Sequence, residues 1–493
     1  MRRRALVVAA LAAAVAGCAV GPSYRRPPVD VPAETRGEPG PPDAASLADL
    51  PWWEVFGDPV LQELVREALA NNHDLKAAVA RVEQARQLVG VARADLLPQI
   101  GYQGEAARGR FFVPGAPSNE TLNAFLGSFN LAWEIDIWGR IRRATEAARA
   151  EYLGTEDFRR GVLLTLVSDV AQAYFELLSL DRELEIARLT TEAFDATVQL
   201  FEDRYEGDVG TLLEVSRGVA AQAQAAATIP AIEAEIVAKE NQICVLLGRV
   251  PGDVVRGAAL DDQSLAPSVP VGLPAQLLER RPDVRQSEQA MVAANANVGV
   301  AVGNFFPRLG LSTLYGGQSS EIENLVKGAG NVWAVAGTLA GPIFQGGRLL
   351  ASYRAQKATW EESVQRFHQT TLNAFAEVSN AMVVEEKLKG VRSEKEIQVR
   401  ALEKSVELSL ERYNEGISTY YEVLEAQQQL FPAQLTLAQT IRNQLVAVVT
   451  LYRTLGGGWS LPVEQWDPAT LPDPAAAPLD APAPSPAETP AAP

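Results

Sequence analysis

Thiols and imidazoles, the side chains most often used in catalysis and soft-metal binding, are scarce in this chain. The 493 residues include two cysteines, Cys18 and Cys244, and two histidines, His73 and His368. No stretch has the spacing of a phosphate-binding loop, a nucleophile elbow or a cysteine-histidine metal cluster. We therefore expect no catalytic site, no bound metal and no cofactor. Cys244 lies in an apolar helical stretch, where we expect a buried, inert thiol.

Cys18 is different, because it ends a segment with the composition of a targeting signal. Three arginines at 2–4 precede a short apolar run at 5–16. The small residues Ala16 and Gly17, directly before Cys18, resemble the lipobox of bacterial lipoprotein signals, in which the cysteine becomes the acylated first residue of the mature chain. By the same resemblance, the non-acidic Ala19 favours sorting to the outer membrane. An ordinary signal peptide with an incidental cysteine is the alternative.

Carboxylates dominate the remaining polar chemistry. The chain has 61 acidic residues against 44 lysines and arginines, a net charge of −17, which makes nucleic acid an unfavourable partner. Glu422 and Glu425 are three residues apart, so they share one face of a predicted helix.

The chain contains an internal repeat with a nearly constant offset. The run 89–92 (VGVA) followed by Pro98 returns as 298–301 (VGVA) followed by Pro307, which is 209 residues later. An offset of 208 relates Gly139-Arg140 to Gly347-Arg348, Arg204-Tyr205 to Arg412-Tyr413, and Glu214-Val215 to Glu422-Val423. Such self-similarity predicts one architectural unit used twice.

Each copy is predicted to hold two strands. Alternating apolar and polar residues are clearest at 125–137, and weaker patterns occur at 99–113, 308–315 and 332–343. The longest apolar run elsewhere, 161–180, is broken by acidic side chains, so we expect any membrane crossing to use strands.

Long helices follow the strands in both copies. The segments 140–205 and 348–413 contain no proline and are each about 65 residues, or about 100 Å as helix. Return helices are predicted at 211–247 and 419–455, interrupted and kinked by Pro230 and Pro432, which occupy non-equivalent positions. Shorter helices are predicted at 74–95 and from Asp283 to Pro307.

The predicted domains follow from this order of elements. They are a signal peptide at 1–17, an N-terminal anchor and equatorial segment at 18–73, a first repeat at 74–248, a connector at 249–281, a second repeat at 282–456, and a C-terminal equatorial segment with a Pro/Ala-rich tail at 457–493. Four strands cannot close a barrel in lipid without leaving open edges, so several chains must contribute to one barrel.

Three motifs carry a specific resemblance to a known family. The runs 277–284 (LLERRPDV), 133–140 (WEIDIWGR) and 341–348 (GPIFQGGR) resemble the TolC-like outer-membrane efflux lipoproteins, and the likeness extends over about 52–459. The resemblance implies an internally duplicated α+β membrane protein. Three chains with four strands each would form a trimeric 12-stranded β-barrel, continued by a long periplasmic α-helical barrel.

The resemblance also implies partners and a gate. The homotrimer would be anchored in outer-membrane lipid through Cys18 and would serve as the exit duct of a tripartite efflux system, with a periplasmic adaptor and an inner-membrane transporter. The positions matching the family's periplasmic gate are Tyr205, Glu214, Tyr413, Glu422 and Glu425. Ordinary solvated helix residues are the alternative for these glutamates.

Other functions stay open at this point. A type I protein secretion system uses the same architecture, a lipid-anchored coiled-coil scaffold would not need the amphipathic strands, and an enzyme would need a catalytic constellation. Trp133, Trp138 and Trp333 are expected at a membrane interface or at the junction of barrel and helices.

Overall fold

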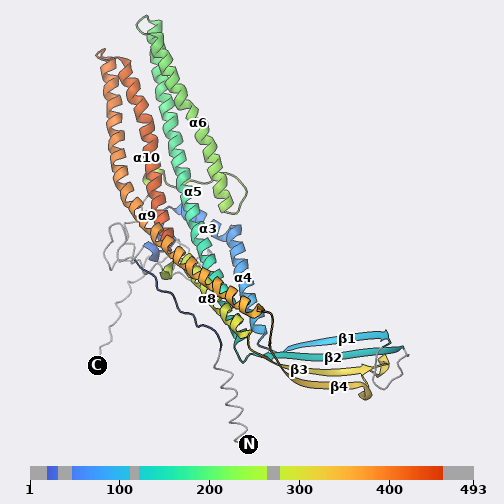
Figure 1. The fold of residues 1–493 in the computed structure, drawn as a ribbon. Helices are drawn as coiled ribbons and strands as arrows, with labels where there is room; N and C mark the ends of the chain where they lie inside the picture. The colour runs from blue at the N-terminus through green and yellow to red at the C-terminus, as the bar shows by residue number, and fades with distance from the viewer. Residues whose placement is uncertain (1–18, 32–46, 111–120, 264–277, 459–493) are drawn as a thin grey trace, which may run out of the picture.

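The computed structural model describes residues 19–31, 47–110, 121–263 and 278–458. Cys18, the signal segment and the Pro/Ala-rich tail lie outside the described residues. A sheet occupies one end of the molecule, long helical hairpins extend to the opposite end, and short helices gather at a waist between them (Figure 1). We call the far end of the hairpins the tip.

The sheet has four antiparallel strands in the order β1-β2-β3-β4. The strands are β1 (Gln99–Gly109), β2 (Leu122–Ile135), β3 (Arg308–Ser319) and β4 (Asn331–Ala340). All four predicted strands are therefore confirmed, with ends that differ by a few residues. The predicted extension of the first strand to 113 lies partly outside the described residues.

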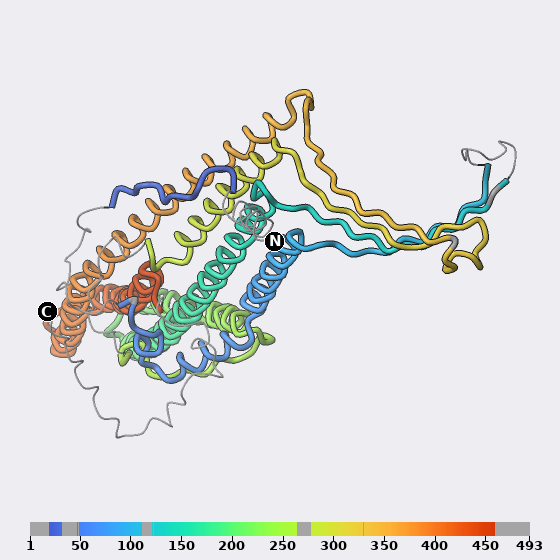
Figure 2. The backbone as a smooth tube through the Cα atoms, turned by 90° about the horizontal axis from the view of Figure 1, so that it is seen from below, coloured from blue at the N-terminus to red at the C-terminus, as the bar shows by residue number. Residues whose placement is uncertain are grey.

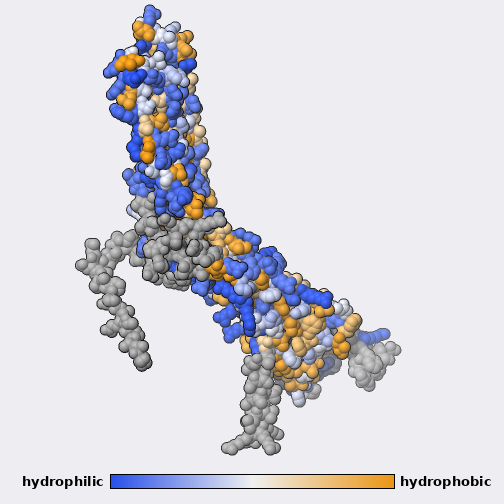
Figure 3. All heavy atoms as spheres, turned by 60° about the vertical axis from the view of Figure 1, so that its left-hand side comes forward, coloured by the Kyte–Doolittle hydropathy of each residue, from blue (hydrophilic) through white to orange (hydrophobic). Residues whose placement is uncertain are grey.

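One face of the sheet is apolar and exposed. Tyr102, Phe129, Tyr315 and Trp333 are directly opposite one another in the register and form an aromatic row across all four strands. Their exposed fractions run from 62% to 85%, which for large apolar side chains calls for a lipid or protein neighbour. Apolar surface gathers over this end of the molecule, whereas the hairpins are largely hydrophilic (Figure 3).

The two long helices are as predicted. They are α5 (Arg140–Glu206) and α9 (Arg348–Asn414), each 67 residues long. The return helices α6 (Leu212–Leu246) and α10 (Tyr420–Thr454) pack along α5 and α9. The prediction that prolines interrupt the return helices is wrong, because both helices continue through Pro230 and Pro432. A proline removes one helical hydrogen bond, and packing over many turns outweighs that loss.

The half of the molecule nearer the sheet uses two shorter helices. They are α4 (His73–Ala94), which packs on α5, and α8 (Pro282–Gly303), which packs on α5 and α9. The N-terminal arm, residues 19–31, runs alongside α8 and α9 (Figure 2). Tyr24 donates a hydrogen bond to Glu288 of α8, and the Arg26 guanidinium lies over the ring of Phe367 of α9.

The main hydrophobic core lies at the waist. It includes α3 (Pro59–Asn71) and the short α2 (Trp52–Val55), with Trp52, Tyr174 and Tyr452 fully buried. α5 contains one window that is long and apolar enough to cross a membrane, but 67% of that window is buried inside the protein. This apolar window of α5 therefore belongs to the hydrophobic core of the protein.

Candidate functional site: the tip and the waist

The tip brings the two copies of the repeat into direct contact. The rings of Phe201 on α5 and Tyr420 on α10 meet edge to face with centroids 3.9 Å apart, and Tyr413 lies 5.3 Å from Tyr420. These rings belong to a buried cluster, here called the tip cluster, of Phe194, Phe201, Ala221, Ala225, Tyr413, Tyr420, Val423 and Leu424. Burial raises the pKa of Tyr420 to about 12.

The two repeated Arg-Tyr pairs occupy different environments. Tyr205 is exposed, whereas its counterpart Tyr413 is buried beneath Arg204, whose guanidinium lies 5.0 Å from the ring centroid. Burial raises the pKa of Tyr413, and the nearby Glu214 carboxylate adds to the rise. Arg204 therefore holds the end of the first hairpin against the second by a cation–π contact.

The three tip glutamates have different partners. Glu214 closes a capping box with Thr211, whose backbone N–H donates to its Oε2 over 2.8 Å. Glu422 forms an ion pair with Arg412, at 3.4 Å between Nε and Oε2. Glu425 accepts a hydrogen bond from Gln429 at 3.3 Å and is exposed. Glu422 and Glu425 thus lie on the surface of the first two turns of α10.

Sequence reasoning missed the partners of these groups. The spacing of Thr211 and Glu214 is the ordinary signature of a capping box and could have been read from the sequence. Thr419 and Glu422 have the same spacing, yet Thr419 makes no side-chain cap, and the Glu422 carboxylate pairs with Arg412. Only the structure separates these two outcomes.

At the waist each copy stacks two helices end to end. In copy one, the amide of Asn72, which caps α4, donates a hydrogen bond of 2.9 Å to the carbonyl of Leu246 at the end of α6. In copy two, Arg281 precedes α8 and donates a bond of 2.9 Å to the carbonyl of Thr454 at the end of α10. Arg281 lies 209 residues after Asn72, and Thr454 lies 208 after Leu246. We call these contacts joint one and joint two.

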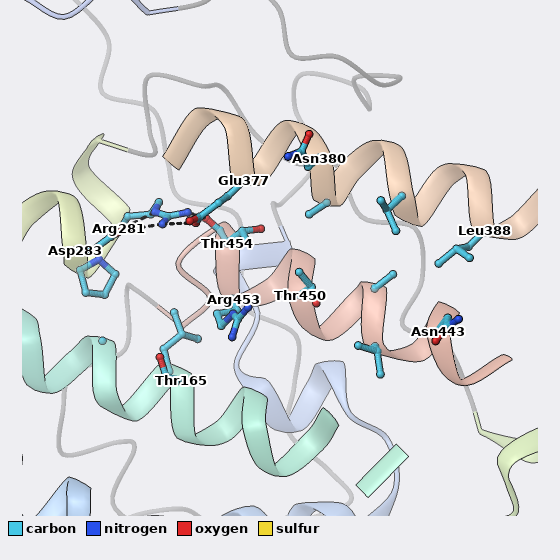
Figure 4. A pocket seen from close by; sticks show the side chains of 17 residues that line it. Thr165, Arg281, Asp283, Glu377, Asn380, Leu388, Asn443, Thr450, Arg453 and Thr454 are labelled. Carbon is cyan, nitrogen blue, oxygen red and sulfur yellow. Dashed lines mark hydrogen bonds and ion pairs between the residues drawn. The ribbon is translucent and has the colours of Figure 1, made fainter. Parts of the chain in front are cut away.

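Joint two carries charge and borders a hollow. Arg281 is buried and contacts Asp283 and Glu377 at 2.7 Å each (Figure 4). Burial alone would lower the pKa of Arg281, but its hydrogen bonds to the two carboxylates raise it. The hollow holds about 730 Å³ between α5, α9 and α10, and its wall includes Val384 and Ala447.

The remaining predicted positions fall at the junction of sheet and helices or in the core. Trp133 donates to the carbonyl of Leu96, Trp138 donates to that of Pro307, and Trp333 is exposed on the apolar face. The predicted junction position is thus confirmed for Trp133 and Trp138, whereas the interfacial position of Trp333 stays a prediction. Cys244 is buried, as predicted. Within the described ranges, no group of three or more histidine, cysteine, aspartate or glutamate side chains could hold a metal ion.

A sheet with two open edges and an exposed apolar face, continued by long helical hairpins, defines a membrane channel assembled from several chains. The chain belongs to the outer membrane efflux protein family, whose model matches residues 64–249 and 273–457.

Named relatives cover nearly the whole chain. The toluene efflux pump outer membrane protein TtgC of Pseudomonas putida is 32% identical, over 93% of this chain and 96% of the relative. The cation efflux system protein CusC of Escherichia coli O157:H7 is 31% identical, over 91% of this chain and 97% of the relative. The solved outer-membrane channel OprN superposes with a TM-score of 0.82 at 29% identity, covering 90% of this chain and 100% of that one.

These likenesses confirm the predicted fold class and function. Three copies of the four-stranded sheet form one 12-stranded barrel, and the hairpins continue it as a helical barrel. The protein is an outer-membrane channel through which an efflux system exports its cargo.

Proposed function

We propose that this chain is the lipid-anchored exit duct of a tripartite pump, with an acidic constriction at its tip. Cargo enters at the tip from a periplasmic adaptor and an inner-membrane transporter, and it leaves through the barrel. The observation that carries the proposal is the exposure of Glu422 and Glu425 on one face of α10, beside the end of the first hairpin.

Three-fold assembly gives each tip glutamate a ring of three carboxylates. A ring of like charges around a narrow aqueous passage favours cations and weakens as salt screens it. Tyr205 and Glu214, at the end of the first hairpin, would line the same constriction beside Glu422. Tyr413 is buried behind them, so its part in the gate is to hold the two hairpins together.

The anchor proposal rests on where the N-terminal arm begins. The backbone N–H of Val20 donates to the carbonyl of Trp138 at 2.9 Å, where β2 passes into α5. Ala19 packs so closely on Gly139 that a Cβ there would lie 2.6 Å from the Ala19 Cα. An acyl chain on Cys18 would therefore start beside the base of the barrel, level with the edge of the membrane.

Planar-bilayer recordings test the constriction. Glu422→Gln combined with Glu425→Gln keeps side-chain shape, removes six charges from the trimer and frees Arg412 from its acidic partner. We expect a reduced preference for cations and a modest change in conductance. The matched control is Glu235→Gln, an exposed glutamate on α6 about 35 Å from the tip, which should leave selectivity unchanged.

Two results would contradict the proposal. Wild-type selectivity and conductance in the double variant would show that these glutamates are ordinary solvated residues. For the anchor, mass spectrometry of the mature N-terminal peptide should find an acylated Cys18, and an unmodified terminus at any other residue would rule the anchor out.

A further inference from the structure

One arginine of the repeat has different partners in the two copies. It lies at the junction where a strand passes into a long helix. In copy one, Arg140 opens α5 and forms a bidentate pair with Glu134, at 2.9 and 3.2 Å. In copy two the arginine is kept as Arg348, but the counterparts of Glu134 and Asp136 are Pro342 and Phe344. Copy two has therefore kept the cation and lost the carboxylates.

Arg348 has no carboxylate within ion-pair distance among the described residues. Within the part of the chain that the structure describes, its guanidinium donates only to the side-chain oxygen of Gln345, at 2.8 and 3.2 Å. It borders a cavity of about 400 Å³ that Arg308 also lines and no carboxylate lines. A cation at the first residue of a helix is also unfavourable to the helix dipole, so an acidic partner is expected.

A carboxylate that lacks a cationic partner within the described ranges lies at the opposite edge of the sheet. Asp95 caps the C-terminal end of α4, where the helix dipole disfavours negative charge. It is exposed, and no hydrogen bond or ion pair of its side chain occurs among the described residues. Asp95 precedes β1, and Arg348 follows β4, at the same end of the sheet.

The two open edges must meet in the trimer. β1 and β4 are the outer strands of the sheet, so β4 of one chain pairs with β1 of the next chain when the barrel closes. Within the chain, β2 pairs with β3 and α5 packs on α8. By the repeat, an equivalent seam should form between neighbouring chains of the trimer. In it, β4 takes the place of β2, and β1 of the next chain takes the place of β3.

This conversion makes specific residues neighbours. Ile135 lies opposite Leu309, and their counterparts, 208 later and 209 earlier, are Ile343 and Ile100. Both counterparts are apolar, and their exposed fractions in the single chain are 103% and 77%. Such exposure is expected of residues that a neighbouring chain covers in the trimer. Gly303 packs on Arg140 so tightly that a Cβ there would lie 3.0 Å from the Arg140 Cβ.

The counterparts of Gly303 and Asn304 are Ala94 and Asp95. We infer that the ion pair of Arg348 forms between chains. Asp95 of the next chain in the trimer supplies the carboxylate that the second half of the repeat lacks, and this ion pair closes each seam of the trimer. Arg308 also lines this cavity and is 55% exposed, but its Nη1 already lies 3.9 Å from the Glu134 carboxylate of its own chain, so Arg348 is the cation left for the incoming carboxylate. The inference rests on the trimer and not on the acidic tip.

Disulfide trapping tests the geometry in the full-length protein. Ala94→Cys with Arg348→Cys should give chains linked as dimers and trimers on a non-reducing gel. The matched control, Gly303→Cys with Arg140→Cys, reproduces the seam inside one chain and should give a disulfide-bonded monomer. A control pair that links, beside an Ala94–Arg348 pair that links no chains together, would overturn the inference.

Charge exchange tests the ion pair itself, with trimer survival in detergent as the readout. Asp95→Arg and Arg348→Asp should each lower the midpoint temperature of trimer dissociation. Their combination should recover at least half of the larger loss, and Arg354→Asp, an exposed arginine on α9 outside the cavity, should change little. A combination no more stable than the weaker single variant would refute the pair.

Discussion

Joint one and joint two solve the same structural problem with different chemistry. Both stack the first turn of a short helix on the last turn of a return helix, at positions related by the repeat. Joint one uses the short neutral Asn72, whereas joint two uses the long cation Arg281 with Asp283 and Glu377. Beside joint one, α5 and α6 are bridged by Glu176 and Lys239 at 2.6 Å.

The hollow beside joint two follows from the same divergence. Val384 and Ala447, which stand where copy one has Glu176 and Lys239, are apolar residues in its wall. The duplication therefore conserved the backbone while the side chains diverged. At this position copy one pairs Glu176 with Lys239 across α5 and α6, and copy two has two apolar side chains that face the hollow.

The tip offers the largest expected contrast between the copies. Phe201 is buried against Tyr420, whereas its counterpart in copy two is Ser409. Phe201→Ala should destabilise the tip by about 3 kcal/mol, since it removes a buried ring from the tip cluster. Ser409→Ala should change stability by less than about 0.5 kcal/mol, because alanine is the better helix former. Hydrogen exchange at the hairpin ends measures both, and equal effects would contradict the contrast.

The two joints should also differ in strength. Arg281→Ala should cost about 2 kcal/mol, since it leaves a carbonyl and two half-exposed carboxylates without their partner. Asn72→Ala should cost about 1 kcal/mol, the usual value of a helix N-cap. The readout is exchange protection in the first turns of α8 and α4. Greater loss for Asn72→Ala would reverse the ranking of the joints.

The first turns of the return helices give a smaller contrast. Thr211→Ala should cost about 1 kcal/mol, because it breaks the capping box with Glu214. Thr419→Ala should be nearly neutral, because the Thr419 side chain caps nothing. Thermal unfolding of the two variants beside wild type tests this, and a loss of equal size at Thr419 would show a cap that the structure lacks.

The smallest expected effect concerns pH. Burial alone would raise the pKa of Glu176, but hydrogen bonds from Lys239 and Gln172 lower it overall. A lowered folded-state pKa adds stability above the ordinary value of 4.5, and this stability is lost as pH falls through the folded-state pKa. The contribution is under about 1 kcal/mol, because the pair is partly exposed. Glu176→Gln should unfold at a lower temperature than wild type at pH 7 and at nearly the same temperature at pH 3. A pH-independent difference would argue against the linkage.

The architecture could be predicted from the sequence because its strands and helices follow from periodic residue patterns. The repeat, the alternation in the strands and the proline-free stretches of α5 and α9 are local signals, and each led to an element that the structure contains. The proline prediction failed because a single missing hydrogen bond is a local cost, while α6 and α10 are held by long packing interfaces.

The site was less predictable, because its chemistry depends on contacts across the repeat. Arg204 and Arg412 are equivalent in sequence, yet one lies over Tyr413 and the other pairs with Glu422. No local pattern distinguishes them, since the choice depends on which hairpin lies beside each. The gate residues and the domain boundaries therefore stay predictions, whereas the fold class and the channel function are confirmed by the family match.

The central claim is that one seam is used both within a chain and between chains. Electron cryo-microscopy of the detergent-extracted protein, at a resolution that shows side chains, tests it most directly. We predict a trimer in which Ile343 lies opposite Ile100 of the next copy and Arg348 contacts Asp95 of that copy within about 4 Å, the limit for an ion pair. A shifted β4–β1 register, or an Arg348 that contacts no carboxylate of the next copy, would contradict the claim.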